Sequence, residues 1–306
     1  MGSERTVAVT PEERNEAPVP AGGDQLAWEA RLGPRIGVVA IAGALLVLAS
    51  FVVQLPLLKD KSKNEAGYLL SVHKHASAYI TSGILQMLAF FAVAALLWYL
   101  YRATKYRRPQ TPPVGVILGI AGPIVFGIAS AVGPFVIRHF AAEFANGLNH
   151  TNQHAKDIVK GGSAEALNII TPIAGLSLVF GMVMTNVNAI RTGLLSTFAG
   201  IIGVIAGVLY LLPLGPPQLL LFFWFVSVAI ILHDRWPGGR GPAWAAGEAI
   251  KWPTAADRRG LTAGSSNGAR AGTPPPPPAD IDGDEMPAQR AGRTSRKRKR
   301  KQGRKH

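Results

Sequence analysis

Cysteine is missing from the 306 residues of the chain, which excludes disulfides, thiolate metal sites and thiol catalysis. The nucleophile motif GxSxG, the phosphate-binding P-loop and the zinc motif HExxH are missing as well. A cleavable signal peptide is not indicated either, because the N-terminus lacks the required basic start and short apolar core. We therefore expect a protein that is not an enzyme, needs no cofactor and keeps its N-terminus.

The sequence contains six long apolar stretches, and none of them has a charged residue or a histidine. They cover Ile36–Leu58, Ala78–Tyr101, Val114–Ile137, Ala166–Val187, Gly193–Leu212 and Leu214–Leu232. A helix rising 1.5 Å per residue needs about 20 residues to cross a ~30 Å hydrocarbon core. Backbone polar groups in lipid must be satisfied within the segment, so these stretches are helices. The sequence predicts an all-α fold, a six-helix transmembrane bundle with disordered termini, although the sixth span is short and Pro216 and Pro217 blur its start.

Composition divides the chain into four parts. We expect residues 1–34 to be a disordered cytoplasmic leader and residues 35–235 to be the six-span membrane domain. Residues 236–259 form a tryptophan-rich juxtamembrane segment, and residues 260–306 form a disordered Pro-rich and polybasic cytoplasmic tail. With an even number of spans, both termini lie on one side of the membrane.

The distribution of Lys and Arg orients the bundle. Up to Arg240, 11 of these residues lie on the side of the two termini and 7 on the other side. Because cytoplasmic loops carry the excess of positive charge, we expect a multi-pass protein of the bacterial plasma membrane with both termini cytoplasmic. The basic tail, which is hard to translocate, favours the same orientation.

The polar content of the spans limits the function. Without ionisable groups, the spans argue against a proton relay or an ion pump but not against passage of a neutral solute. Small residues at four-residue spacing, such as Gly115 and Gly119, predict close helix packing inside the bundle, with a homodimer seam as the alternative; the oligomeric state stays open. Pro123 and Pro172 could mark a broken-helix transport site, although such kinks are also common without transport.

Two histidines in a loop are weak candidates for a metal site. His150 and His154 are four residues apart, so on a helix they would face one way, as in zinc sites. A zinc site needs three or four convergent ligands, and we therefore favour solvated histidines and predict no metal.

Two features of the cytoplasmic segments predict contacts with the membrane surface. Trp236, Trp244 and Trp252 are eight residues apart and suit anchors at the headgroup level, or packing under the bundle. Eight cations of the tail form a tether that could bind lipid or nucleic acid: Arg296, Lys297, Arg298, Lys299, Arg300, Lys301, Arg304 and Lys305. Anionic lipid headgroups are our first choice of partner, nucleic acid the second and acidic proteins the third.

Four short segments are distinctive within a region of about 60 residues: "NAIRTGLL" (Asn188–Leu195), "LPLGPP" (Leu212–Pro217), "FFW" (Phe222–Trp224) and "RWPGGRGPAW" (Arg235–Trp244). In these segments the region resembles a family of uncharacterised multi-spanning membrane proteins from actinobacteria. The resemblance implies a bacterial plasma-membrane protein and supplies no activity. We therefore expect a non-enzymatic membrane component whose basic tail binds anionic lipid or partners. The alternative is a small permease or channel for a weakly polar solute.

Overall fold

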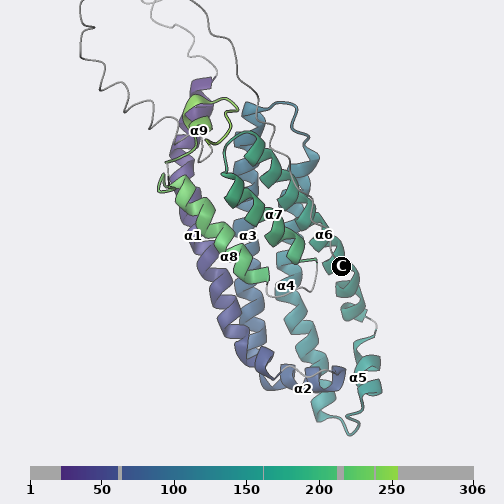
Figure 1. The fold of residues 1–306 in the computed structure, drawn as a ribbon. Coiled ribbons are helices and arrows are strands. Elements are labelled where there is room, and N and C mark those ends of the chain that lie inside the picture. The colour runs from purple at the N-terminus through teal and green to yellow at the C-terminus, as the bar shows by residue number, and fades with distance from the viewer. Residues whose placement is uncertain (1–21, 61–63, 161, 212–216, 238, 254–306) are drawn as a thin grey trace, which may run out of the picture. The chain divides into compact units, whose positions relative to one another are not determined.

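The computed structural model describes residues 22–253, apart from residues 61–63, 161, 212–216 and 238. Every regular element in this part of the chain is a helix (Figure 1). The helices are α1 (Gly22–Lys59), α2 (Glu65–Lys74), α3 (Ala76–Arg107), α4 (Val114–Asn146), α5 (Asn152–Val159), α6 (Gly162–Arg191), α7 (Thr197–Leu209), α8 (Pro217–Leu232) and α9 (Pro242–Ala246). The all-helical fold class is thus confirmed for the described residues.

Among the described residues, four helices are long and apolar enough to cross a membrane: α1, α3, α4 and α6. They contain the first four apolar stretches of the sequence. The two remaining stretches form shorter helices among the described residues: Ser196 caps the start of α7, and α8 begins at Pro217. With 13 and 16 residues, α7 and α8 are about 20 and 24 Å long, below the ~30 Å of a hydrocarbon core.

The first long helix begins earlier than the sequence predicts. We expected residues 1–34 to be a disordered leader, but Gly22–Pro34 is helical and forms the first turns of α1. The physical reason is packing: Glu29 is buried, and the Trp28 ring lies edge-on to Trp98 with the ring centroids 5.7 Å apart. Pro34 is accommodated inside the continuous helix. Residues 1–21 lie outside the described part.

The long helices pack side by side: α3 packs against both α1 and α4, and α4 packs against both α3 and α6. Glycines permit the closest approaches. A Cβ atom added to Gly181 of α6 would collide with the backbone of Gly119, and one added to Gly83 of α3 would collide with the Ser130 carbonyl of α4. As expected from the sequence, the small-residue row of α4 is therefore packed inside the bundle.

The short helices α7 and α8 form a hairpin that packs against α6 and α1. Trp224 of α8 donates a hydrogen bond through Nε1 to Asn186 Oδ1 of α6, at 2.9 Å, and both residues are completely buried. Gly203 of α7 makes room for this bond, because a Cβ there would overlap both partners. Trp224, the last residue of the "FFW" segment, is thus a core residue of the bundle.

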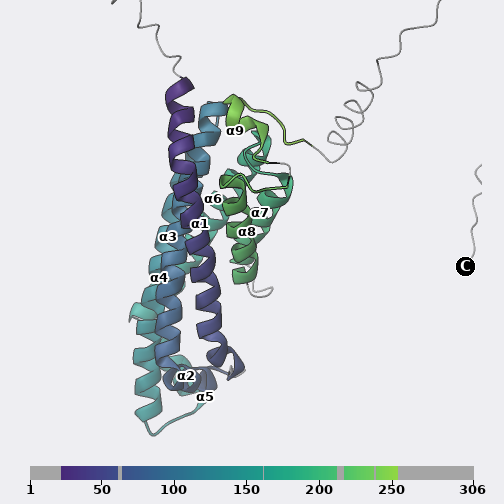
Figure 2. The same ribbon diagram turned by 90° about the vertical axis from the view of Figure 1, so that its left-hand side faces the viewer.

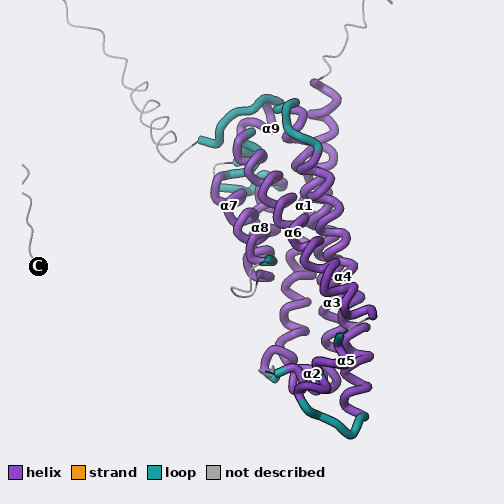
Figure 3. Tube along the Cα trace, turned by 90° about the vertical axis from the view of Figure 1, so that its right-hand side faces the viewer, coloured by secondary structure: helices purple, strands orange, loops and turns teal. Residues whose placement is uncertain are grey.

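The long helices have two different ends, which we name by the short helices found there. At the α2–α5 end, α2 and α5 lie across the bundle and cover a small apolar core that includes Leu69 and Phe144 (Figure 2). At the α9 end, the start of α1 and the residues after α8 lie together (Figure 3). The hairpin returns to the end at which it begins, so residues 22 and 253 lie at the same end of the bundle.

Candidate functional site at the α9 end

Two of the distinctive sequence segments meet at the α9 end. Trp244 of α9 donates a hydrogen bond through Nε1 to the carbonyl of Leu194, at 2.9 Å, across 50 positions of the chain. Gly193 adopts a positive φ of 75°, and a Cβ there would collide with the carbonyl oxygen of Ile250. "NAIRTGLL" and "RWPGGRGPAW" therefore form one structural unit, in which the segment after α8 is docked against the turn that follows α6.

A buried ion pair fixes this unit to the first and third helices. Glu29 of α1 is 2% exposed and Arg107 of α3 is 9% exposed. The Arg107 guanidinium donates two hydrogen bonds of 2.8 Å to the two carboxylate oxygens of Glu29. Its Nε atom donates to the carbonyl of Ala243 in α9, at 2.9 Å. A bidentate pair with its donors satisfied is the geometry in which burial of two charges is compensated.

Aromatic rings complete the cluster around the ion pair. Tyr99 stacks on Trp244 with ring centroids 5.9 Å apart and an interplanar angle of 15°, and its hydroxyl donates to the Glu29 carbonyl. The Arg240 guanidinium lies 4.2 Å above the Trp244 ring, and that of Arg107 lies 5.4 Å from it. The cluster contains two arginines and one carboxylate, so it carries a net positive charge.

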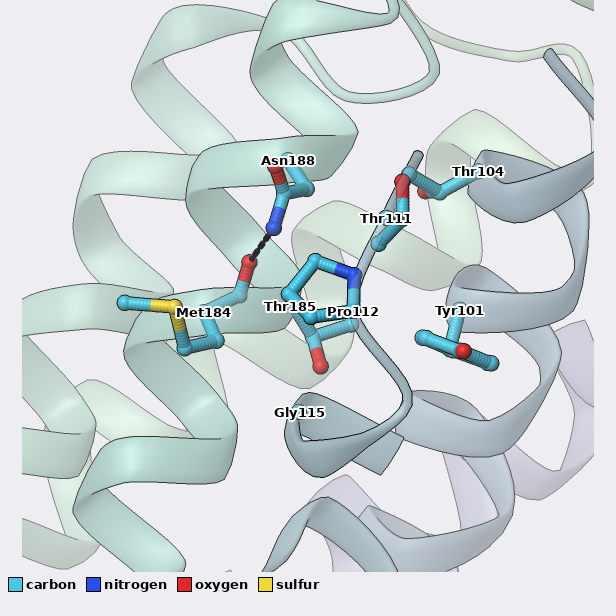
Figure 4. Close-up of a pocket in the computed structure, with 8 residues that line it drawn as sticks. All are labelled: Tyr101, Thr104, Thr111, Pro112, Gly115, Met184, Thr185 and Asn188. Atoms are coloured by element: carbon cyan, nitrogen blue, oxygen red, sulfur yellow. Dashed lines mark hydrogen bonds between the residues drawn. The ribbon is translucent and has the colours of Figure 1, made fainter. Parts of the chain in front are cut away.

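A small cavity lies beside this cluster, between α3, the turn to α4 and α6. It is lined by Tyr101, Thr104, Thr111, Pro112, Gly115, Met184, Thr185 and Asn188 (Figure 4). Three of these residues place buried hydroxyls without a hydrogen-bond partner in the described structure: Tyr101, Thr104 and Thr185. The Asn188 amide is used elsewhere, since it donates to the Met184 carbonyl at 2.8 Å.

The size of the cavity limits its occupant. About 10 Å³ is open to the centre of a water molecule, which is room for about one water. Leaving buried hydroxyls unpaired costs roughly 1–3 kcal/mol each, so a bridging water is the chemically favoured occupant. The cavity is thus suited to hydration of the helix ends and too small for a substrate the size of a metabolite.

The three predicted tryptophan anchors occupy different surroundings. Trp244 is buried by protein, as described above, whereas Trp236 and Trp252 are half-buried. Trp236 lies beside Phe198 at the start of α7, with ring centroids 6.2 Å apart, and Trp252 covers Gly241. The segment is packed under the bundle, and contact of its two outer tryptophans with lipid headgroups stays a prediction.

The two candidate histidines lie at the other end of the bundle, the α2–α5 end (Figure 2). His150 and His154 flank the ring of Phe144, with centroid distances of 5.4 and 6.1 Å. Within the described residues, no group of three or more His, Asp or Glu side chains is placed to hold a metal ion. Nearby on α2, burial raises the pKa of Tyr68, whose hydroxyl lies 3.1 Å from that of Tyr79.

Sequence reasoning missed the central pair of the site. Glu29 was one of several acidic residues in the expected leader, and Arg107 was one of several cations that set the orientation. The available signal was local: Gln25 and Glu29 are one helical turn apart, and the Gln25 amide donates to Glu29 at 3.1 Å. The eight tail cations lie outside the described residues, as do residues 254–259 of the juxtamembrane segment.

These features define a membrane protein: an all-helical bundle with four helices able to span a bilayer and two shorter apolar helices. The chain belongs to the family described as "Domain of unknown function (DUF4386)", whose model matches residues 35–232. No significant match was found to a curated protein or to a solved structure. The matched region ends with α8, so the docked α9 segment lies beyond the family domain in this chain.

Proposed function

We propose that the protein is a non-enzymatic component of the bacterial plasma membrane that binds anionic lipid or partners through its cytoplasmic α9 end and basic tail. The observation that carries the proposal is the docked segment after α8. It is fixed to α1, α3 and the turn after α6 by the Arg107, Trp244 and Gly193 contacts. The described part of the chain, which ends at residue 253, is therefore fixed to the bundle at its α9 end.

The charge of the α9 end supports this orientation. Arg102, Lys105, Arg108 and Arg191 lie at the ends of α3 and α6 near α9, in addition to the buried Arg107. Positive charge at helix ends favours the cytoplasmic face and its anionic headgroups, worth about 1 kcal/mol per cation near the surface. On this proposal the eight cations of residues 296–305 and the cations of the α9 end bind the same anionic leaflet.

The proposal includes six spans, with α7 and α8 crossing as a hairpin. The apolar composition of both helices supports their insertion into the membrane. A single cysteine replacing Leu211, which is exposed at the end of α7, tests this point. Labelling by a membrane-impermeant maleimide from outside intact cells is expected, and labelling only after permeabilisation would limit the protein to four spans.

Vesicle binding by the tail tests the main proposal. The full chain is reconstituted in nanodiscs, and its capture of free vesicles containing phosphatidylglycerol is measured at physiological salt. Replacing the eight tail cations by Gln is expected to abolish capture, whereas a scrambled tail of unchanged composition keeps it. Equal capture by the neutralised chain would refute the tether. Retention of RNA by the wild-type chain, with no capture of vesicles, would favour nucleic acid.

The partner branch of the proposal has its own test. Affinity purification from the native membrane compares the full chain with a chain ending at residue 259. Loss of acidic partner proteins from the shortened chain is expected if the tail recruits them. Among the described residues, no observation favours the permease. Large side chains such as Trp224, Phe90 and Phe225 fill this part of the bundle, and the cavity between α3, α4 and α6 has room for about one water.

A further inference from the structure

A groove on the outside of the bundle combines cations with an apolar floor. It lies over α3 at the α9 end, with Gln25 of α1 and the start of α4 also lining it, and has a volume of about 500 Å³, within the usual range for small-molecule sites. Arg102, Lys105 and Tyr106 of α3 line it towards the helix end. Val116, near the start of α4, lines it at the same end, whereas Trp98 of α3 and Ile120 of α4 lie further along the two helices.

The spacing along the two helices explains this arrangement. Trp98, Arg102 and Lys105 are separated by four and three residues, so they lie on one face of α3. Val116 and Ile120 are four residues apart and face them from α4, which packs against α3. The groove therefore runs from within two predicted spans, at Trp98 and Ile120, to positions just beyond Tyr101, where the second predicted span ends.

The two cations of the groove are exposed and carry no carboxylate partner among the described residues. The Arg102 guanidinium lies 4.1 Å above the ring of Trp28, and Lys105 Nζ lies 5.9 Å from the ring of Tyr101. Aromatic faces hold the cations in place and leave their charge uncompensated. An anionic group with two oxygens or more is the complementary ligand.

We propose that this groove binds one anionic phospholipid, with its phosphate between Arg102 and Lys105 and an acyl chain along Trp98, Val116 and Ile120. Charge complementarity selects the anionic headgroup, and the apolar floor at membrane depth selects a lipid over a soluble phosphate ester. The inference rests on the proposed function in placing the α9 end at the anionic leaflet. It adds a specific site on the bundle to the diffuse binding by the tail.

Native mass spectrometry of the purified full chain, titrated with dioleoylphosphatidylglycerol, tests the site. In every chain compared, the eight tail cations are replaced by Gln, so that the measured lipid binding comes from the bundle and not from the tail. One tightly retained lipid is expected. The double variant Arg102→Gln/Lys105→Gln should bind it about 30-fold more weakly, from roughly 1 kcal/mol per cation. The control Arg31→Gln/Arg35→Gln removes the same charge from exposed positions of α1 at the same end and should bind like the parent.

Each other outcome is decisive as well. Equal binding by the groove variant and the control would overturn the site, as would equal retention of phosphatidylcholine, which lacks the net negative charge. Displacement of the lipid by glycerophosphoglycerol at the same concentration would overturn the lipid as ligand. Unchanged melting temperatures show that the folded state is retained. A positive result here, with no effect of the tail on vesicle capture, would refute the tail's role while keeping the groove.

Discussion

At the α9 end the main ion pair is buried in protein, whereas at the α2–α5 end the ion pairs are exposed. Glu29 and Arg107 are almost fully covered and are bonded to a third segment through the Ala243 carbonyl. Asp60 and Lys74, at the other end, are 40% and 67% exposed in their side chains. Exposed pairs contribute little, while removal of one partner from a buried pair leaves an uncompensated charge. The comparison indicates that the α9 end is held in one arrangement and that the opposite end tolerates change.

The largest effect is expected from breaking the buried pair. Arg107→Met leaves the Glu29 carboxylate buried without its partner and should lower the free energy of unfolding by about 3–5 kcal/mol. Thermal unfolding of the purified chain in detergent measures it. Lys74→Met is the matched control at the other end and should leave the melting temperature nearly unchanged. Equal losses in the two variants would remove the contrast between the ends.

The hairpin contact with α6 should be the next most sensitive point. Gly203→Ala places a methyl group against Trp224 Nε1 and Asn186 Oδ1, and overpacking of this kind costs about 1–3 kcal/mol. Gly133→Ala is the control, because a Cβ at Gly133 has no neighbour within 4 Å. That control should be neutral or slightly stabilising, as expected for Gly→Ala in a helix. A neutral Gly203→Ala would show that α7 packs differently from the structure described above.

A smaller effect is expected at the cavity. Thr185→Val removes one of the three hydroxyls that we expect to bind a water, and it should cost about 1 kcal/mol. Thr192→Val is the reference substitution, because the Thr192 hydroxyl already has a hydrogen-bond partner in the protein: it donates to the Asn188 carbonyl at 3.0 Å. A stabilised Thr185→Val chain, measured by thermal unfolding, would show that the cavity is dry.

The smallest effect concerns pH at the α2–α5 end. Two hydrogen bonds to the Asp60 carboxylate, the more important one from Lys74 and the second from His75, lower the pKa of Asp60 to about 2, from an ordinary value near 3.9. The folded state therefore gains from Asp60 above the ordinary pKa, and this gain is lost as the pH falls towards 2. The melting temperatures of the wild type and Asp60→Asn should differ slightly at pH 6, and the difference should shrink below about pH 4 and vanish near pH 2. A constant difference down to pH 2 would contradict the ion pair.

Hydropathy was sufficient to find the membrane helices but not their lengths or connections. Each of the long helices contains one predicted span, because about 20 uncharged residues leave a helix as the main solution in lipid. The capped helices α2 and α5 had local signals, since Asn64 and Thr151 accept hydrogen bonds from the first turns that follow them. These signals are weak beside the apolar runs, and the sequence reading passed over them.

The candidate site was less predictable than the fold. Arg107 and Glu29 are 78 positions apart, and nothing in the spacing of either residue indicates the other. Trp244 was predicted to lie at the headgroup level or to pack under the bundle, and which of the two holds depends on the turn after α6, where Trp244 bonds to Leu194. Such contacts arise from the packing of distant helices, which a local pattern does not contain.

Accessibility of single cysteines in intact cells tests the central claim most directly, and the cysteine-free chain gives a clean background. Leu148→Cys marks the α2–α5 end and Lys251→Cys marks the α9 end, both at exposed positions. A membrane-impermeant maleimide should label Cys at position 148 from outside and Cys at position 251 only after permeabilisation. The reverse pattern would place the α9 end outside the cell and contradict both the lipid groove and the cytoplasmic tether.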